Sequence, residues 1–245
     1  MKIIAAVTTM LLLVASGAIA ETTNSLTGSE IQGRALVQQL LQQRPAEDFT
    51  NSGVLQIRDS NGKRLKIPIH SQIIITEPNS LNWLHSYQAT MTNNEIRLMV
   101  VHTPEAGLNK YQLFTDGVQK NITGSETMTS FADSDFWICD LGLEFFHWPQ
   151  QKVIKKENHR SCGCIVLEST NPNPTTNSYS RVVSWIDSES LGIVEAYAYD
   201  AKGKLLKDFY PKDLKKINGQ WQVQTLVMEN VQTGSKSRLE FDLKK

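Results

Sequence analysis

The feature that most restricts the fold is a run of short strand-like segments toward the C-terminus. Five segments read as successive strands: Arg181–Asp187, Gly192–Tyr199, Lys204–Lys216, Gln220–Asn230 and Ser237–Leu243. The residues between them are mostly Gly, Asn, Asp and Ser, which favour tight turns. Tight turns join strands that run in opposite directions. Because no helical segment is interleaved, the pattern excludes a parallel α/β sheet.

The same pattern begins much earlier in the chain. Asp59-Ser60-Asn61-Gly62 is a hairpin turn between two alternating runs, 54–57 and 65–69. Further strands are predicted at 72–77, 82–91, 95–102, 110–115, 151–156 and 164–170. The sequence therefore predicts an α+β protein built on one long, curved antiparallel sheet of about eleven strands.

One long helix precedes the strands. Ser29–Arg44 places its apolar residues on a single helical face, with Ser29 as the N-cap and Pro45 just beyond the last residue. One helix is too small to cover the apolar face of such a sheet. A second covering segment is therefore expected.

The aromatic segment 135–151 is the candidate for that second cover. Only 8% of the chain is aromatic, yet five large aromatic residues lie in this segment. We expect a short helix that is capped by Asp133 or Ser134 and ended by Pro149. Two interpretations stay open: ordinary core that closes one end of the sheet, or a lid (residues 133–149) over an apolar cavity. The candidate ligand-binding residues are Trp137, Leu141, Phe145, Phe146 and Trp148 on the lid, with Trp185 and Trp221 on the sheet.

The N-terminus has the pattern of a secretory signal peptide. Lys2 precedes an apolar run from Ile3 to Val14, and Ala18-Ile19-Ala20 supplies small residues at the two cleavage-recognition positions. The run is shorter than the roughly 20 residues of a membrane span. We expect residues 1–20 to be removed after Ala20, residues 21–28 to be a flexible N-terminus, and residues 29–245 to form a single domain in the periplasm.

The charge balance argues against nucleic acid as a partner. The chain has 25 basic and 25 acidic residues, and the lysines are spread among turns and strand ends. Nucleic-acid binding through phosphates requires a basic patch or stripe. We therefore expect no nucleic-acid partner.

The three cysteines leave two alternatives open. Cys139 could form a disulfide with Cys162 or Cys164, or all three could be free thiols. Zinc binding with His159 is disfavoured, because the Cys-x-Cys spacing is not that of the usual zinc sites. We expect no metal site.

The sequence gives little support for an enzyme. It contains no Gly-x-Ser-x-Gly elbow, no His-Glu-x-x-His motif and no phosphate-binding loop. Asp133, Asp135 and Asp140 could flank a cleft as an acid/base pair, although helix capping explains them equally well. We expect no catalytic residues and no cofactor.

A family resemblance adds to these expectations. The C-terminal half resembles the LolA/LolB superfamily of bacterial lipoprotein carriers, and within it the outer membrane lipoprotein-sorting proteins. The resemblance covers roughly residues 80–245, and its motifs are Trp185-Ile186-Asp187, Tyr199-Asp200, Gly203–Lys207, Gly219-Gln220-Trp221, Met228-Glu229-Asn230, Thr233-Gly234, the segment 134–151 and "CIVLES" at 164–169.

The resemblance implies a LolA-like domain, an incomplete antiparallel β-barrel with helices as a lid on its concave face. Members of the family carry lipoprotein acyl chains or related lipids across the periplasm. One departure concerns the arginine that helps to hold the lid closed in the carriers, because Arg58, Arg64 and Arg97 do not lie in that motif.

Together these observations predict an exported periplasmic carrier. It would bind lipid or lipoprotein acyl chains in an apolar cavity, work as a monomer, and exchange cargo with membrane-bound donor and acceptor proteins. The alternative is an exported non-catalytic scaffold that binds another protein through the sheet edge or the aromatic segment. A hydrolase is the third hypothesis.

Overall fold

The computed structural model describes residues 26–76, 80–104, 107–217 and 220–243. The predicted signal peptide, its cleavage point and most of the predicted flexible N-terminus lie outside these ranges. Within them no helix is long and apolar enough to cross a membrane. The helices are α1 (Gly28–Gln42), η1 (Gly124–Met128), α2 (Ile138–Leu141) and η2 (Glu144–His147).

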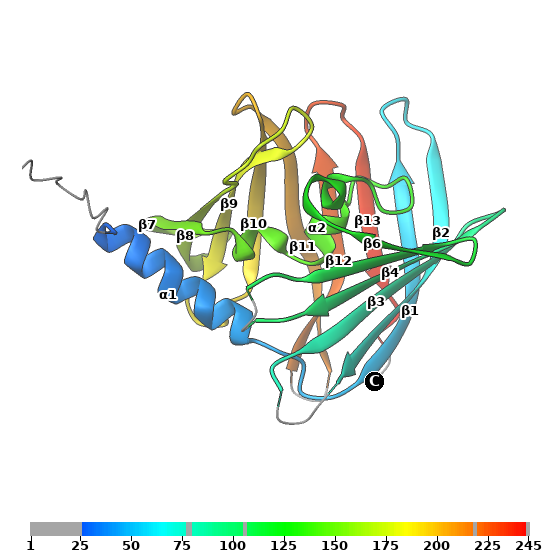
Figure 1. The fold of residues 1–245 in the computed structure, drawn as a ribbon, viewed down its shortest axis with the longest axis horizontal. Coiled ribbons are helices and arrows are strands. Elements are labelled where there is room, and N and C mark those ends of the chain that lie inside the picture. The colour runs from blue at the N-terminus through cyan, green and yellow to red at the C-terminus, as the bar shows by residue number, and fades with distance from the viewer. Residues whose placement is uncertain (1–25, 77–79, 105–106, 218–219, 244–245) are drawn as a thin grey trace, which may run out of the picture.

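In the described ranges of the chain, thirteen strands form a single sheet (Figure 1). They are β1 (Phe49–Arg58), β2 (Arg64–Ile75), β3 (Trp83–Thr90), β4 (Glu95–His102), β5 (Lys110–Thr115), β6 (Val118–Ile122), β7 (Gln150–His159), β8 (Cys162–Thr170), β9 (Tyr179–Asp187), β10 (Ile193–Asp200), β11 (Leu205–Ile217), β12 (Gln220–Asn230) and β13 (Lys236–Phe241).

The sheet is antiparallel and unclosed. Its order is β6-β5-β4-β3-β2-β1-β13-β12-β11-β10-β9-β8-β7, so every strand except β1 and β13 pairs only with its neighbours in the chain. The pairing of β1 with β13, for example Gly53 with Phe241, joins the two halves. The predicted curved sheet with few helices is therefore confirmed.

The turns form as their residues predict. In the first hairpin the Asp59 carboxylate accepts hydrogen bonds from the backbone N–H groups of Asn61 and Lys63, both at 2.9 Å. Gly62 adopts a φ of 83° at the end of this turn, a conformation that glycine adopts without steric cost. Asp200 caps the turn before β11 in the same way, through Lys202 and Lys204.

Two details of the strand prediction are wrong. The predicted strands at 65–69 and 72–77 are one strand, β2, and β6 was not predicted. Val118–Ile122 is mostly polar because β6 is an edge strand with four exposed residues, and edge strands often carry polar and charged side chains. The residues that the structure describes form thirteen strands rather than about eleven.

The N-cap of the N-terminal helix lies two residues before the predicted cap. Thr27, not Ser29, is the N-cap, and its side chain and that of Glu30 form a capping box. The helix buries Leu36, Val37 and Leu40 against the sheet. A Cβ atom on Gly33 would meet the backbone of Gln151 at 2.6 Å, so α1 packs on β7 more closely than any other residue at this position would allow.

The predicted lid helix is not continuous. α2 is a single turn and η2 is a separate 3-10 turn, because Leu143 between them has a φ of 50°. Neither Asp133 nor Ser134 caps α2, since its N-cap position is Trp137. Pro149 does precede the next element, β7.

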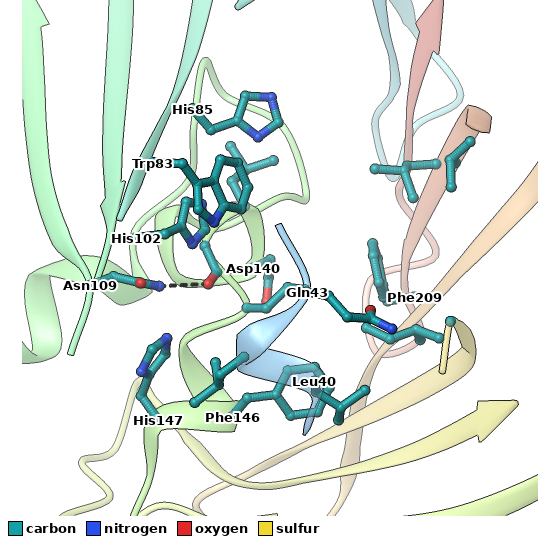
Figure 2. Close-up of a pocket in the computed structure, with 18 of the residues that line it drawn as sticks. Leu40, Gln43, Trp83, His85, His102, Asn109, Asp140, Phe146, His147 and Phe209 are labelled. Carbon is teal, nitrogen blue, oxygen red and sulfur yellow. Dashed lines mark hydrogen bonds between the residues drawn. The ribbon is translucent and has the colours of Figure 1, made fainter. Parts of the chain in front are cut away.

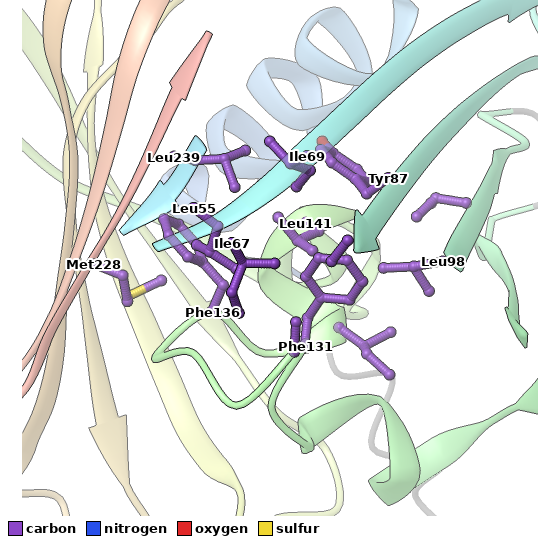
Figure 3. Close-up of a cluster of buried hydrophobic side chains, with 14 of the residues drawn as sticks. Leu55, Ile67, Ile69, Tyr87, Leu98, Phe131, Phe136, Leu141, Met228 and Leu239 are labelled. Carbon is purple, nitrogen blue, oxygen red and sulfur yellow. The ribbon is translucent and has the colours of Figure 1, made fainter. Parts of the chain in front are cut away.

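The core consists of two clusters on the covered face of the sheet. The first joins β1–β6 and β11–β13 to Phe131, Phe136 and Leu141 (Figure 3). The second joins α1 and β8–β10 to Phe145, Phe146 and Trp148. Both clusters include residues of segment 133–149, which we call the lid segment. The lid segment therefore packs against the sheet along most of its length.

The three cysteines are free. Cys139 packs in the second core cluster with Leu167 of β8. Cys164 lies three residues before Leu167 on that strand, so its side chain points to the opposite face. The sheet separates Cys139 from Cys164. Of the two alternatives, the structure has three free thiols and no disulfide from Cys139 to Cys162 or Cys164.

Candidate functional site

A partly open cavity of about 350 Å³ lies between the two halves of the curved sheet (Figure 2). The lid segment contributes Phe136, Asp140, Leu141, Gly142, Leu143, Phe146 and His147. β3 and the segment from β4 to β5 contribute Trp83, His85, Tyr87, His102, Pro104 and Asn109. The opposite wall is formed by Leu191, Gly192, Ile193, Phe209, Pro211, Val223 and Leu226, and α1 and the residue after it add Leu40, Leu41 and Gln43.

Most of this lining is apolar. No lysine or arginine is among the described residues that line the cavity, and Asp140 is its only acidic residue. The volume lies within the range of about 300–1,000 Å³ that is typical of small-molecule sites. The cavity is therefore suited to an apolar guest rather than to a charged one.

One wall carries aromatic and imidazole rings. Trp83 stacks on His102 with ring centroids 3.8 Å apart and planes at 10°. His85 accepts or donates hydrogen bonds at 2.9 Å to the Tyr87 hydroxyl and at 2.8 Å to the Ser71 hydroxyl. Burial lowers the pKa of His85 and of His102 to about 3. Both imidazoles are neutral near neutral pH and provide no positive charge for an anionic ligand.

A buried ion pair holds the lid segment to the sheet. The Lys207 ammonium of β11 lies 3.5 Å from the Asp140 carboxylate and donates a hydrogen bond to the Asp135 carbonyl at 2.6 Å. The Tyr179 hydroxyl of β9 donates to Asp140 at 3.0 Å. Burial raises the pKa of Asp140 and lowers that of Lys207, and each charge opposes the shift of the other.

The Lys207 ammonium is also enclosed by aromatic rings. It lies 3.6 Å from the ring centroid of Trp137, which stacks on Tyr179 at 4.4 Å. Cation–π contacts of a desolvated ammonium are worth up to about 2 kcal/mol. Lys207 therefore fixes the position of the lid segment through both charge and ring contacts.

A second polar contact joins the lid segment to β5. The Asn109 amide donates to the Gly142 carbonyl at 2.7 Å, and the Tyr111 hydroxyl donates to Glu144 at 2.6 Å. Burial raises the pKa of Glu144 to about 7, although the Tyr111 hydrogen bond opposes this shift. A Cβ atom on Gly142 would meet the Tyr111 hydroxyl at 2.2 Å, so this contact requires glycine at position 142.

The structure divides the predicted residues of the lid segment into two groups. Leu141 and Phe146 line the cavity. Trp137, Phe145 and Trp148 are packed in the lid segment and are not part of its lining. Ligand binding by any of these residues stays a prediction.

The two tryptophans predicted on the sheet are not among the residues that line the cavity. Trp185 is adjacent to Ile186 in β9, and Ile186 belongs to the second core cluster on the covered face. Because adjacent side chains of a strand point to opposite faces, Trp185 points to the uncovered face. There its ring stacks on His159 at 4.8 Å and its N–H donates to Glu157 at 2.8 Å. Trp221 is 68% exposed on β12.

Two of the aspartates that were considered as an acid/base pair have structural partners. Asp135 accepts hydrogen bonds from Ser235 and Ser237, and Asp140 pairs with Lys207. Asp133 is exposed. In the described part of the chain no group of three or more His, Cys, Asp or Glu side chains could hold a metal ion.

The sequence prediction missed the histidine and aromatic wall. Trp83, His85 and Tyr87 follow one another at intervals of two in a strand, which places them on one face. That alternation was the available signal. The meeting of this face with His102 and with β10–β12 depends on long-range pairing and curvature, which no local pattern encodes.

Comparison with known proteins supports the fold. Among solved structures, a DUF1329 family protein from Desulfovibrio piger has a TM-score of 0.71 at 20% identity, with 88% of this chain and 92% of that chain covered. An outer membrane lipoprotein-sorting protein domain from Vibrio parahaemolyticus has a TM-score of 0.70 at 18% identity, with 87% and 92% covered. A LolA superfamily protein from Nitrosomonas europaea has a TM-score of 0.59 at 14% identity, with 89% and 93% covered. The predicted LolA-like fold is confirmed.

The sequence comparisons give a narrower result. No curated protein matches the chain significantly. A family model described as "Uncharacterized protein" matches residues 115–244. Because this match spans more than half of the chain, the protein belongs to that family.

Proposed function

We propose that this protein is an exported, non-catalytic carrier that holds a lipid acyl chain in the cavity. The observation that carries the proposal is the apolar lining of the partly open 350 Å³ cavity, with no lysine or arginine among its described residues. The relatives with this fold include a lipoprotein-sorting domain and a LolA superfamily protein. We therefore propose acyl chains of lipoproteins, or related lipids, as the cargo.

The lining predicts how the cargo sits. Each buried methylene contributes about 0.8 kcal/mol, so an apolar chain gains affinity without a charged anchor. The carboxylate of Asp140 is already paired with Lys207, and His85 and His102 are neutral. The acyl chain therefore occupies the cavity, and a charged head group stays at its mouth.

A cavity-filling substitution tests this proposal. Ile193 lines the cavity, and Ile193→Trp would occupy space that the chain needs. Ile154 on β7 is 47% exposed and is not among the lining residues, so Ile154→Trp is the matched control. Both variants should keep the far-ultraviolet spectrum of the wild type, and binding of a fluorescent acyl probe should be lost only in Ile193→Trp.

A chain-length series adds a second measurement. The affinity of straight-chain acyl ligands should increase by about fourfold per methylene until the cavity is full. Equal probe binding by Ile193→Trp and wild type would contradict the proposal. A folded protein that binds no acyl ligand of any length would leave the protein-binding scaffold as the better account.

A further inference from the structure

The hairpin of β11 and β12 carries exposed apolar side chains beside the cavity. Trp221 is 68% exposed, Leu214 55% and Val223 36%. Leu214 and Val223 are directly paired across the two strands, so their side chains lie on the same side of the sheet. Trp221 is two residues from Val223 on β12 and points to that side too.

These side chains continue the lining of the cavity. Val223, Leu226 and Pro211 are lining residues, and Pro211 pairs with Leu226 across the hairpin. The apolar surface therefore extends from the cavity along the hairpin to Trp221 without a change of element. We call Leu214, Trp221 and Val223 the hairpin patch.

The charges around the hairpin patch are mainly positive. Lys212, Lys215 and Lys216 lie within five consecutive residues of β11, and Asp213 is the one acid among them. The Lys216 ammonium lies 5.9 Å from the Trp221 ring centroid, and Lys212 lies 3.8 Å from the Asp213 carboxylate. Within these five residues three lysines and one aspartate give a formal net charge of +2, whereas the formal net charge of the whole chain is zero.

We propose that the hairpin patch docks on an anionic phospholipid surface and places the mouth of the cavity against it. This inference rests on the proposed function, because it supplies the route by which an acyl chain enters or leaves. An exposed tryptophan beside aliphatic side chains inserts readily at the boundary between lipid head groups and acyl chains. Lysines next to it are attracted to anionic head groups.

Tryptophan fluorescence can report this docking. Trp221 is in the exposed class, whereas Trp83, Trp137, Trp148 and Trp185 are buried or half-buried. Vesicles of phosphatidylcholine that contain phosphatidylglycerol should shift the emission to the blue, and lipids brominated on the acyl chain should quench it. Vesicles of phosphatidylcholine alone should have a much smaller effect, and added salt should reverse the binding.

Paired variants locate the docking surface. Trp221→Ala should weaken vesicle binding about tenfold or more, and each of Lys212→Glu and Lys216→Glu should weaken it at least about fivefold. Leu214→Ala should also weaken binding. Leu65→Ala is its matched control, because Leu65 is 46% exposed on the β1–β2 hairpin at the opposite end of the sheet.

Two outcomes would overturn the proposal. The first is no binding of the wild type to anionic vesicles. The second is vesicle binding that the hairpin variants leave unchanged, which would place the docking surface elsewhere on the molecule. The acyl probe, measured without vesicles, separates this result from the proposed function. Vesicle binding with no probe binding would remove the carrier and keep the docking surface, and the reverse would remove only the docking surface.

Discussion

Lys207 offers the sharpest test of how the lid segment is held. The residue is 1% exposed, and its ammonium contacts the Asp140 carboxylate, the Asp135 carbonyl and the Trp137 ring. Lys207→Met keeps much of the aliphatic volume but leaves Asp140 buried without its counter-charge. Breaking a buried ion pair from one side costs about 3–5 kcal/mol. The variant should lose that much of its free energy of unfolding.

The loss should depend on pH. Burial already raises the pKa of Asp140, and the Lys207 charge opposes that shift. In Lys207→Met the opposition is gone, so the folded-state pKa rises further above the unfolded value. A carboxyl group of this kind binds more protons in the folded state than in the unfolded state, and stability falls as the pH rises between the two values. Lys207→Met should therefore be closer to wild type in mildly acidic buffer than in mildly alkaline buffer.

The double variant Lys207→Met/Asp140→Asn provides the control. This variant removes both charges. In the wild type the Asp140 carboxylate accepts a hydrogen bond from the backbone N–H of Trp137 at 2.8 Å, and the amide oxygen introduced at position 140 can still accept it. Guanidinium unfolding of Lys207→Met, Asp140→Asn, the double variant and wild type gives the coupling energy between the two side chains. We expect the double variant to be more stable than Lys207→Met in alkaline buffer. A Lys207→Met protein with wild-type stability, or a double variant that is no better, would refute the buried ion pair.

Three further predictions concern other contacts of the cavity wall. Tyr111→Phe should lower the free energy of unfolding by about 1–3 kcal/mol, and most of this loss should occur above pH 7, because the pKa of Glu144 is about 7. Unfolding curves on either side of that pH test it, and a loss that does not depend on pH would contradict it. Gly142→Ala should lower the free energy of unfolding by about 1–3 kcal/mol through overpacking against Tyr111. Gly28→Ala is the control, because a Cβ atom on Gly28 meets nothing within 4 Å, and equal thermal midpoints of the two variants would contradict the prediction. The pKa of His102 is about 3, below its ordinary value of 6.5. The folded state therefore binds fewer protons than the unfolded state, and stability falls as the pH drops below 6.5. His102→Phe should reduce this acid sensitivity, and an acid unfolding transition at the same pH as in the wild type would refute the prediction.

Local chemistry accounts for the part of the fold that the sequence predicts well. Turns such as Asp59–Gly62 and Asp200–Gly203 are specified by their own residues, and the alternation between them identifies the strands. The helix at Gly28–Gln42 follows from its apolar face and its capping box. β6 escaped prediction because an edge strand does not need the alternating pattern.

The site is harder to predict because it depends on which face of the sheet each side chain points to. Trp185 and Ile186 are adjacent and both apolar, so alternation alone does not tell which of them faces the lid segment. The aromatic spacing of the lid segment suggested one helix, but Leu143 breaks it into two turns. Trp83 and Phe209 belong to opposite halves of the sheet and reach the same cavity only through its curvature.

The central claim is that the cavity holds an acyl chain, and native mass spectrometry of the protein purified from its own host tests it most directly. The wild type should carry a mass adduct that lipid extraction identifies as an acyl-containing molecule. Ile193→Trp should lose the adduct, and Ile154→Trp should keep it. A wild-type protein without any lipid adduct, or an adduct that survives Ile193→Trp unchanged, would contradict the claim.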